Sequence, residues 1–368
     1  MPALKEALPR VRSHPLAFPL LAVTLLAAAG ALAGPGLERT VIECMVLMLV
    51  VVSLHLFSGN SGVVSVCHVA FVQLGAYVSA LVTMDAERRS VMLPDMPGAI
   101  AGVHAGLPVS MLIACALCAV VAAVTGPLLM RLNGLRSAIA TFSLLLIVDN
   151  VVMNWGAVTG GPSALIGVTE STTVLQVWLA LVAAAVLCHG FARSNAGLRL
   201  RTSREDEVAA RALGINVPRE RLTAFVLSAV IAGLAGALFA HRLSTLNPED
   251  FGLKMTFFVL AMLIIGGMRS LSGAVLGALV VTVLTEALLR FEGGVEIGRY
   301  VVTGPAGLRE LGLAVVLIVI LIRRPEGITR GRDITLPRWR GARARRGGPV
   351  ARQGSGDPEP LDEGARVR

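Results

Sequence analysis

The sequence predicts an all-α fold: a polytopic helical membrane protein with about eight to ten transmembrane helices and one short helix outside the membrane. Of its 368 residues, 55% are hydrophobic and 15% are charged, and the mean hydropathy is +0.74. Soluble domains carry about 25% charged residues. Long apolar segments flank an Arg-rich stretch at 193–221. This stretch lies outside the membrane in our interpretation, because an Arg at the bilayer centre costs about 2.5–3.5 kcal/mol.

The first apolar segment resembles a signal peptide, because Lys5, Arg10 and Arg12 precede an apolar run from Phe18 to Ala33. Ala-rich chain continues directly into a second apolar segment. We therefore interpret residues 1–16 as an N-terminal extension followed by an uncleaved first span.

Apolar segments of roughly the length that crosses the hydrocarbon core, about 20 residues, recur along the chain. The predicted spans are 17–34, 41–58, 62–83, 109–130, 136–153, 174–192, 222–241, 255–268, 271–290 and 304–322. The break between the eighth and ninth spans rests on Gly266, Gly267, Arg269, Ser270 and Gly273, which favour a tight turn.

The distribution of basic residues predicts the orientation. With ten spans both termini lie on one side, and 25 of the 33 Lys and Arg residues then fall on that side, including those of the 193–221 loop. The positive-inside rule places this side in the cytoplasm. The loops 35–40, 84–108, 154–173, 242–254 and 291–303 are then expected outside.

The chain divides into a membrane domain over 17–322 and a basic tail over 323–368, which is rich in Arg, Gly and Pro. We expect the tail to be disordered and to lie on anionic lipid. No soluble segment is large enough for an enzyme core. The basic residues flank apolar spans and are not interleaved with aromatics, which argues against nucleic-acid binding.

Motifs for nucleotide binding or catalysis are absent from the sequence. It contains no G-x-x-x-x-G-K-[ST] loop, no H-E-x-x-H and no G-x-S-x-G. The five cysteines lie inside apolar segments at spacings that fit no zinc site, so packing is the favoured interpretation. We therefore predict no enzyme activity, no cofactor and no metal.

Polar residues in or beside the spans are candidates for a substrate path. The ionisable ones are Glu43, His55, His68, Asp149, His189 and Glu286. Most lie near predicted span ends, where an interfacial position or, for Glu286 and Arg290, a helix-end pair is the simpler explanation. His68 is the most interior, and an interhelical hydrogen bond is favoured over a transport role.

Two further groups of polar residues lie where a path could open. Gln73 shares the span of His68. Thr159, Gly160 and Gly161 follow the fifth span, where the glycines give backbone freedom. A plain turn explains this second group equally well.

The 193–221 loop contains a helix-like run. Ser203 is a candidate N-cap with Asp206 three residues later, and Glu205, Asp206 and Glu207 suit the first turn of a helix. Arg211 and then Gly214 suit its end. Val208, Ala209, Ala212 and Leu213 recur at helical spacing. About ten residues are marginal for an isolated helix, so it packs either on its own bundle or in the groove of a soluble ATPase.

Four segments together resemble the permease subunits of bacterial branched-chain amino acid ABC transporters over most of residues 40–328. The most specific is REDEVAARALGINVPRERLTAFVLSAVIAGLAGALFAH at 204–241. The others are RLNGLRSAIATFSL at 131–144, VLAMLIIGGMRSLSGAVLGALVV at 259–281 and RRPEGI at 323–328.

The resemblance implies that residues 193–221 form a cytoplasmic coupling loop, which transmits ATPase closure to the spans. It implies the coupling residues Arg204, Glu205, Asp206, Glu207, Ala209, Ala210, Arg211 and Gly214. It also implies a bacterial inner-membrane location and three kinds of protein partner: separate ATP-binding subunits, a second permease that is identical or distinct, and an extracytoplasmic substrate-binding protein.

Two departures from the family pattern bear on the substrate. The family's Ser-x-Gly-His-x-x-Phe block has Cys67 in place of its Gly and is followed by Gln73 in place of a later Gly. Pro162, Ser163 and Ala164 follow Thr-Gly-Gly where the family has Ser-Asp/Asn-Gly. The expected solute is a branched-chain or related amino acid, with urea, short amides or another small solute as the alternative. An ion-coupled secondary transporter is disfavoured, because no chain of buried carboxylates is present.

Overall fold

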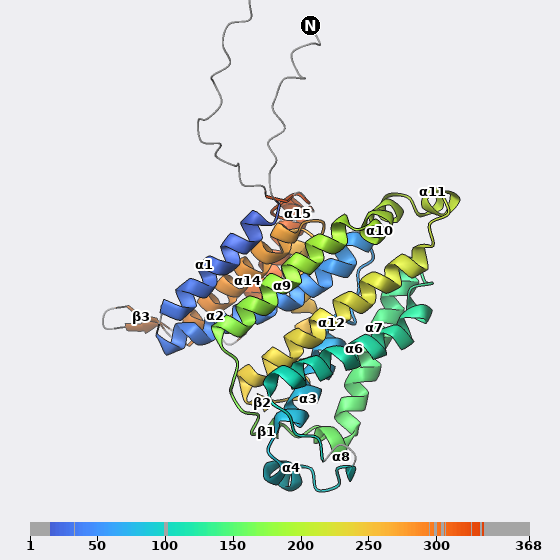
Figure 1. Cartoon of the computed structure of the whole chain (residues 1–368). Coiled ribbons are helices and arrows are strands. Elements are labelled where there is room, and N and C mark those ends of the chain that lie inside the picture. Colours follow the sequence, from blue (N-terminus) through green and yellow to red (C-terminus); the bar gives the residue numbers. More distant parts are fainter. Residues whose placement is uncertain are drawn as a thin grey trace, which may run out of the picture. The chain divides into compact units, whose positions relative to one another are not determined.

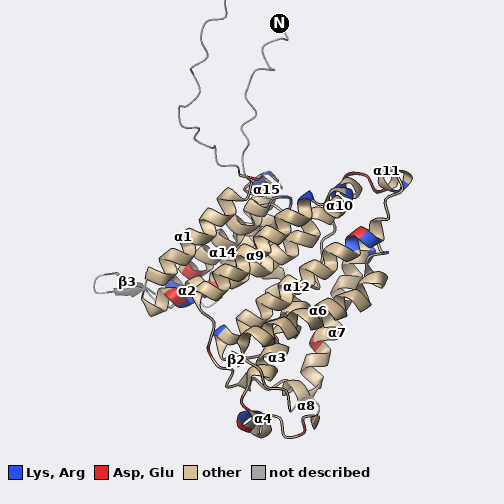
Figure 2. Ribbon diagram, viewed as in Figure 1, with Lys and Arg blue, Asp and Glu red and all other residues tan. Residues whose placement is uncertain are grey.

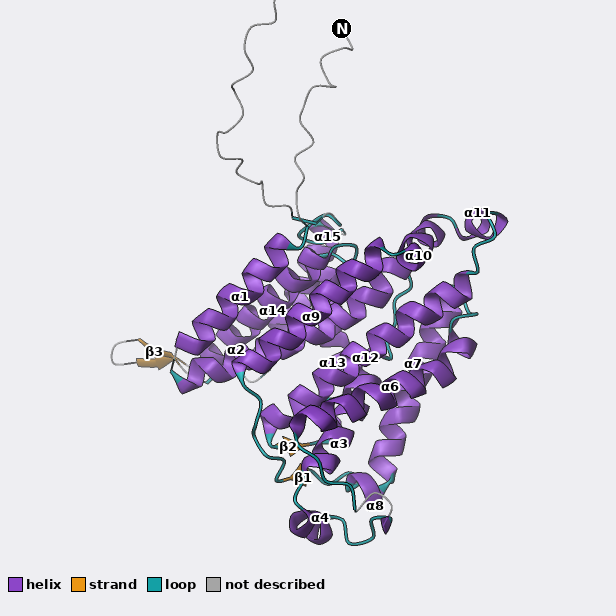
Figure 3. Cartoon of the chain, in the orientation of Figure 1, coloured by secondary structure: helices purple, strands orange, loops and turns teal. Residues whose placement is uncertain are grey.

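The computed structural model describes residues 15–32, 34–98, 102–293, 295–297, 300–302, 305, 307–324, 326–331 and 333–334. Helices dominate these residues (Figures 1 and 3). The predicted N-terminal extension and the distal part of the tail fall outside them. The all-α prediction is confirmed.

The described helices include one at each predicted span. They are α1 (Ala17–Leu32), α2 (Pro35–Leu54), α3 (His68–Thr83), α6 (Leu107–Leu129), α7 (Leu135–Asn154), α9 (Val174–Arg193), α12 (Val217–Leu243), α13 (Gly252–Gly266), α14 (Leu271–Glu292) and α15 (Leu308–Arg323). Among the described residues, six helices are long and apolar enough to cross a membrane: α2 with its continuation to Gly59, α6, α7, α9, α12 and α14. The other four are 15 or 16 residues long.

Short elements lie at the ends of these helices. They are α4 (Ala86–Met92), α8 (Gly156–Thr159), α10 (Asn195–Glu205), α11 (Glu207–Ala212), a 3-10 turn (Pro248–Asp250), and the antiparallel pairs β1 (Leu165–Ile166) with β2 (Thr245–Leu246) and β3 (Val295–Ile297) with β4 (Tyr300–Val302). Leu165 lies opposite Leu246 in the first pair. Figure 1 shows α10 and α11 at one end of the bundle and α4, α8 and the β1–β2 pair at the other.

The structure corrects the sequence prediction at both ends of α2. The helix begins at Pro35, so the predicted loop 35–40 is its first turn and a half. Proline suits this position because its missing N–H would be unpaired in any case. After Leu54 the helix widens into a π-helical turn, His55–Gly59.

The predicted span 62–83 is helical only from His68, and residues 62–67 are irregular. Hydroxyl groups accept hydrogen bonds from three backbone N–H groups of this break: Ser61 from Val63 (3.2 Å), Ser58 from Ser65 (3.3 Å) and Thr141 from Val66 (3.4 Å). Non-helical backbone at membrane depth is stable only with such partners.

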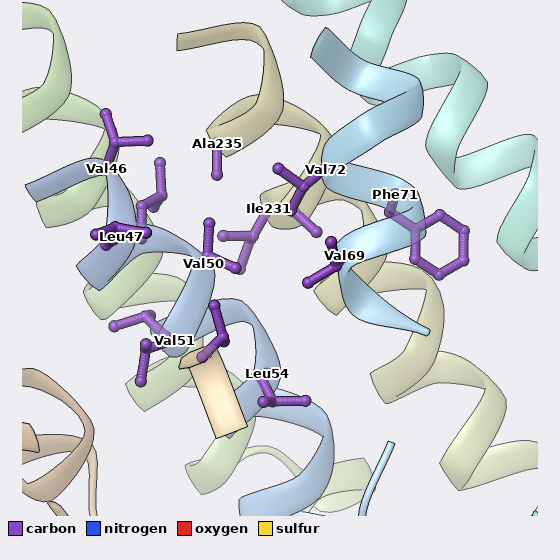
Figure 4. Packing of buried hydrophobic residues seen from close by; sticks show 14 of the residues in the cluster. Val46, Leu47, Val50, Val51, Leu54, Val69, Phe71, Val72, Ile231 and Ala235 are labelled. Carbon is purple, nitrogen blue, oxygen red and sulfur yellow. The ribbon is translucent and has the colours of Figure 1, made fainter. Parts of the chain in front are cut away.

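The centre of the bundle is the packing of α2, α3 and α12. Figure 4 shows valine and leucine side chains of α2, among them Val50, facing Val69 and Val72 of α3 and Ile231 of α12. All of these side chains are buried. Lipid tails are as apolar as these side chains, so the hydrophobic effect does not drive helix association within the bilayer. Such packing relies on close van der Waals contact.

Small residues bring α3 and α12 into backbone contact. A methyl group added to Gly75 would meet the carbonyl of Gly233, and one added to Gly236 would meet the carbonyl of Val72. The Gly273 and Gly277 pair packs in the same way against α13. These small-residue faces are therefore helix contacts.

Residues 255–290 lie in two helices, α13 and α14. They are joined by a tight turn at Gly267, whose φ is +113°. Ser270 begins α14 by accepting the Gly273 N–H at 2.9 Å. The predicted break is thus confirmed.

Part of the predicted tail folds back on this turn. The Ile328 N–H donates to the Ile265 carbonyl (2.9 Å), and the Thr329 hydroxyl donates to the Gly266 carbonyl (2.9 Å). Asp333 accepts the Ser270 hydroxyl at 3.0 Å. The described residues 326–331 and 333–334 are therefore attached to the bundle, in contrast to the expectation of disorder from residue 323 onward.

Candidate functional site

The Arg-rich loop forms two helices, where the sequence predicted one. α10 begins at the N-cap Ser194, whose hydroxyl accepts the Gly197 N–H at 3.2 Å. The predicted N-cap Ser203 is instead buried inside α10, and its hydroxyl donates to the Leu200 carbonyl. Asp206 has an extended backbone conformation, which ends α10, and α11 begins at the next residue.

α11 is capped at its start by Asp206, which the sequence prediction placed in the first turn of a helix capped by Ser203, and at its end by Gly214, as predicted. The Asp206 carboxylate accepts the Ala209 N–H at 3.0 Å. Gly214 has φ +79°, in the left-handed region that ends many helices. The Ile215 N–H then donates to the Ala210 carbonyl at 3.1 Å. Six residues are too few for a stable isolated helix, so its attachment to the bundle matters.

Glu207 attaches α11 to two other segments. Its carboxylate accepts hydrogen bonds from Arg221 of α12 (3.0 Å), Asn133 of the α6–α7 turn (3.0 Å) and Arg211 (2.5 Å). The Arg221 side chain is 5% exposed and also donates to Asn133. Partial burial raises the pKa of Glu207, but Arg221 and these hydrogen bonds outweigh it and hold that pKa below its usual value.

Arg204 attaches α10 to the end of α2. Its guanidinium donates to the Gly59 carbonyl at 2.6 Å and pairs with Glu205 at 2.9 Å. The hydrogen bond from Arg204 holds the pKa of Glu205 below its usual range. Gly62 has φ +73° and packs against the Arg204 stem with no room for a Cβ. The loop thus contacts the π-helical turn and the helix break of 62–67.

The apolar stripe of α11 is free of the bundle. Val208 is 79% exposed and Leu213 is 75% exposed, and Ala209 and Ala212 are exposed with them. Ala210 is the buried residue of this helix. The sequence left two interpretations open: the stripe packs on its own bundle, or it binds in the groove of an ATPase. The exposure of the stripe excludes the first.

The substrate-path candidates lie apart from this loop, on α3 and after α7. His68 lies between the Ser65 and Ser228 hydroxyls, at 2.9 Å from each. The bond to Ser228 joins α3 to α12. The structural interpretation of His68, an interhelical hydrogen bond, is confirmed.

Gln73 lies one and a half turns further along α3 and is fully buried. Its amide donates to the Asp149 carboxylate on α7 at 3.2 Å. The sequence indicated both residues but not their pairing, because nothing in the local pattern of either helix reports which faces meet.

Thr159, Gly160 and Gly161 form a tight connection at the end of α7. The buried Thr159 hydroxyl lies 2.6 Å from the Val152 carbonyl and 2.9 Å from the Trp155 carbonyl. Gly160 and Gly161 have φ values of +79° and +63°. Two consecutive left-handed residues favour glycine here, so the turn interpretation explains both glycines.

The remaining ionisable candidates have structural partners. Glu286 pairs with Arg290 at 2.9 Å, as predicted, and Glu43 pairs with Arg242 at 3.6 Å. His55 contacts the Met268 carbonyl at 2.9 Å. Sequence reasoning missed Asn133 and Arg221, whose roles depend on contacts between segments distant in the chain.

Charged residues concentrate at the ends of the helices, and the helix middles are nearly free of them (Figure 2). Among the described residues, no group of three or more His, Cys, Asp or Glu side chains could hold a metal ion. The fold and its charge distribution define a multi-pass helical membrane protein.

Comparison with known proteins gives the family. The profile of the branched-chain amino acid transport system permease component matches residues 36–322. The chain belongs to this family of transport permeases.

Curated relatives agree. The chain is 28% identical to the high-affinity branched-chain amino acid transport system permease protein LivM of Escherichia coli, over 77% of this chain and 68% of that protein. It is 30% identical to the autoinducer 2 import system permease protein LsrC of Enterobacter sp. strain 638, over 50% of this chain and 57% of LsrC. No solved structure matches the chain.

Proposed function

We propose that this chain is the membrane-spanning subunit of an ATP-binding-cassette importer for branched-chain or related amino acids. Separate subunits would hydrolyse ATP, because the sequence lacks a phosphate-binding loop. A second permease and an extracytoplasmic binding protein would complete the importer. The relatives' names and the family support the solute class.

The observation that carries the proposal is the exposed apolar stripe of α11. A helix that exposes Val208 and Leu213 at more than 70% of their surface has an unused binding face. Helices commonly bind partners by placing such a face in an apolar groove. Glu207 fixes α11 to α12 and to the α6–α7 turn, so force applied to the stripe reaches the spans.

Arg204 provides a second route from the loop into the bundle. Through the Gly59 carbonyl it contacts the π-helical turn, and beside Gly62 it contacts the broken segment before α3. π-helical turns frequently occur at functional sites. Movement of α10 would therefore reach α3, which carries His68 and Gln73.

In this proposal the α10–α11 end faces the cytoplasm of a bacterial inner membrane, with both termini on that side. The basic residues of the 193–221 loop and Arg269 support this orientation. The opposite end, with α4, α8 and the β1–β2 pair, would then face the binding protein.

The similarity to LsrC supports a second candidate, an importer of the same type for another small solute. The two candidates differ only in the solute. Uptake assays with the twenty amino acids, urea and short amides separate them.

The docking proposal is tested by placing charge on the stripe. Val208→Asp and Leu213→Asp should prevent co-purification of the ATPase and abolish uptake, while thermal unfolding in detergent stays unchanged. Val91→Asp on α4 is the matched control for co-purification of the ATPase, because Val91 is 76% exposed at the opposite end. Retention of the ATPase by both stripe variants would refute docking through α11.

A further inference from the structure

One face of α3 carries two buried polar atoms without a partner. Gln73 and Tyr77 are one helical turn apart and are 0% and 2% exposed. Within the described part of the chain, neither the Gln73 carbonyl oxygen nor the Tyr77 hydroxyl has a hydrogen-bond partner. Leaving a buried polar group unpaired costs about 1–3 kcal/mol, so two neighbouring ones need an explanation.

The surroundings of these atoms are negatively charged. The Asp149 carboxylate accepts the Gln73 amide at 3.2 Å. The described ion pairs leave Asp149 without a basic partner. The site therefore favours a cation.

The three acceptors match a primary ammonium group. Such a group has three N–H donors and no acceptor, and the site offers the Asp149 carboxylate, the Gln73 carbonyl and the Tyr77 hydroxyl oxygen. Ca²⁺ takes six to eight oxygen ligands and Mg²⁺ a full octahedron. A single carboxylate with two neutral oxygens is too few for either ion.

The outward face of α7 differs from that of α6. Every exposed residue of α6 is apolar, as lipid requires, whereas α7 exposes Ser143, Asn150 and Asn154, each of which donates to a backbone carbonyl of its own helix. An amide facing hydrocarbon is costly. This face therefore borders water or another subunit, and Asp149, which is half-buried beside Asn150, lies at its edge.

We propose that Gln73, Tyr77 and Asp149 bind the ammonium group of the transported solute, which reaches them along the outward face of α7. This inference rests on the proposed function and restricts the solute to compounds with a free amino group. Asp149 supplies the countercharge, and the two α3 oxygens orient the donors.

The decisive variant is Tyr77→Phe. The hydroxyl has no partner in the folded bundle, so its removal should leave thermal unfolding unchanged. If the hydroxyl accepts a donor of the ammonium group, the maximal rate of L-leucine uptake by the complete transporter should fall about tenfold. Thr282→Val, which removes a buried hydroxyl from α14, is the control and should retain the uptake rate.

Asp149→Asn tests the countercharge, because the amide oxygen can still accept from Gln73. Its uptake rate should fall by more than that of Tyr77→Phe. Wild-type uptake at full rate by both variants would overturn the inference and leave the proposed function intact. Uptake of none of the twenty amino acids by the wild-type transporter would overturn both.

Discussion

Arg221→Met is the most informative perturbation of the coupling loop. Arg221 donates to Glu207 and to Asn133 from a side chain that is only 5% exposed. Methionine retains the apolar stem and removes both donors. The Glu207 carboxylate still accepts hydrogen bonds from Arg211 and Asn133, so it loses part of its stabilisation but is not left without a partner.

The size of the effect follows from the burial of the two partners. Removing one partner of a fully buried ion pair costs about 3–5 kcal/mol. The Glu207 side chain is 23% exposed, so water screens part of this loss. Hydrogen bonds to charged groups contribute about 1.5–3 kcal/mol, and we expect a loss of about 2 kcal/mol in the local stability of α11.

Hydrogen exchange measures this local stability directly. A loss of about 2 kcal/mol corresponds to about thirtyfold faster exchange of the amides from Ala209 to Ile215. Arg221→Lys should restore only part of the protection, because an ammonium lacks the planar fork of the guanidinium.

Arg39→Met is the control for loss of an exposed ion pair. Arg39 pairs with Glu170 at 3.7 Å, and the two side chains are 65% and 52% exposed. Exposed pairs contribute about 0–1 kcal/mol, so exchange of the α11 amides should stay at the wild-type rate. Equal exchange rates for Arg221→Met and wild type would refute the assignment of Arg221 as the anchor of α11.

Three further substitutions test other parts of the structure. Gly236→Ala should reduce the yield of folded protein, measured by size-exclusion chromatography, because the added methyl group meets the Val72 carbonyl and overpacking costs about 1–3 kcal/mol. Gly190→Ala is the control and should fold normally, because its methyl group meets nothing within 4 Å. Glu207 has a lowered pKa, so its stabilisation is complete above the unfolded value of about 4.3 and is lost as pH falls through the folded value. Glu207→Gln should therefore flatten the acid limb of the exchange profile, and an unchanged limb would contradict this. Thr159→Val removes two hydrogen bonds that hold the end of α7, and should increase proteolysis at Gly160 by about tenfold.

The sequence predicted the helices well, because each depends on a local run of apolar residues. The turn between α13 and α14 was also predictable, since Gly267 and Ser270 mark it directly. The end of α11 at Gly214 follows from the residue type alone, because glycine readily adopts a left-handed conformation. These features need no knowledge of tertiary contacts.

Errors arose where tertiary contacts override local pattern. Residues 62–67 are as apolar as a span but are not helical, because distant hydroxyls such as that of Thr141 accept hydrogen bonds from their backbone. Ser203 has the chemistry of an N-cap, but it is buried inside α10, where its hydroxyl donates to the Leu200 carbonyl. The described residues 326–331 and 333–334 have the composition of a disordered tail, yet the α13–α14 turn forms hydrogen bonds with them.

The site residues were predicted singly and not as groups. Gln73 and Asp149 are 76 positions apart, and no periodicity relates them. Arg221 had the appearance of one more basic residue in an Arg-rich loop. Its burial against Asn133 and Glu207 appears only when the α6–α7 turn is placed beside α12.

The central claim is that α11 presents its apolar stripe to an ATPase, and a photo-cross-linking residue at Leu213 tests it most directly. Irradiation of native membranes should join this chain to a protein that contains a G-x-x-x-x-G-K-[ST] loop, whereas the same group at Val91 should not. Capture of the ATPase from Val91 and not from Leu213 would contradict the account, as would solute uptake in vesicles that contain no ATP.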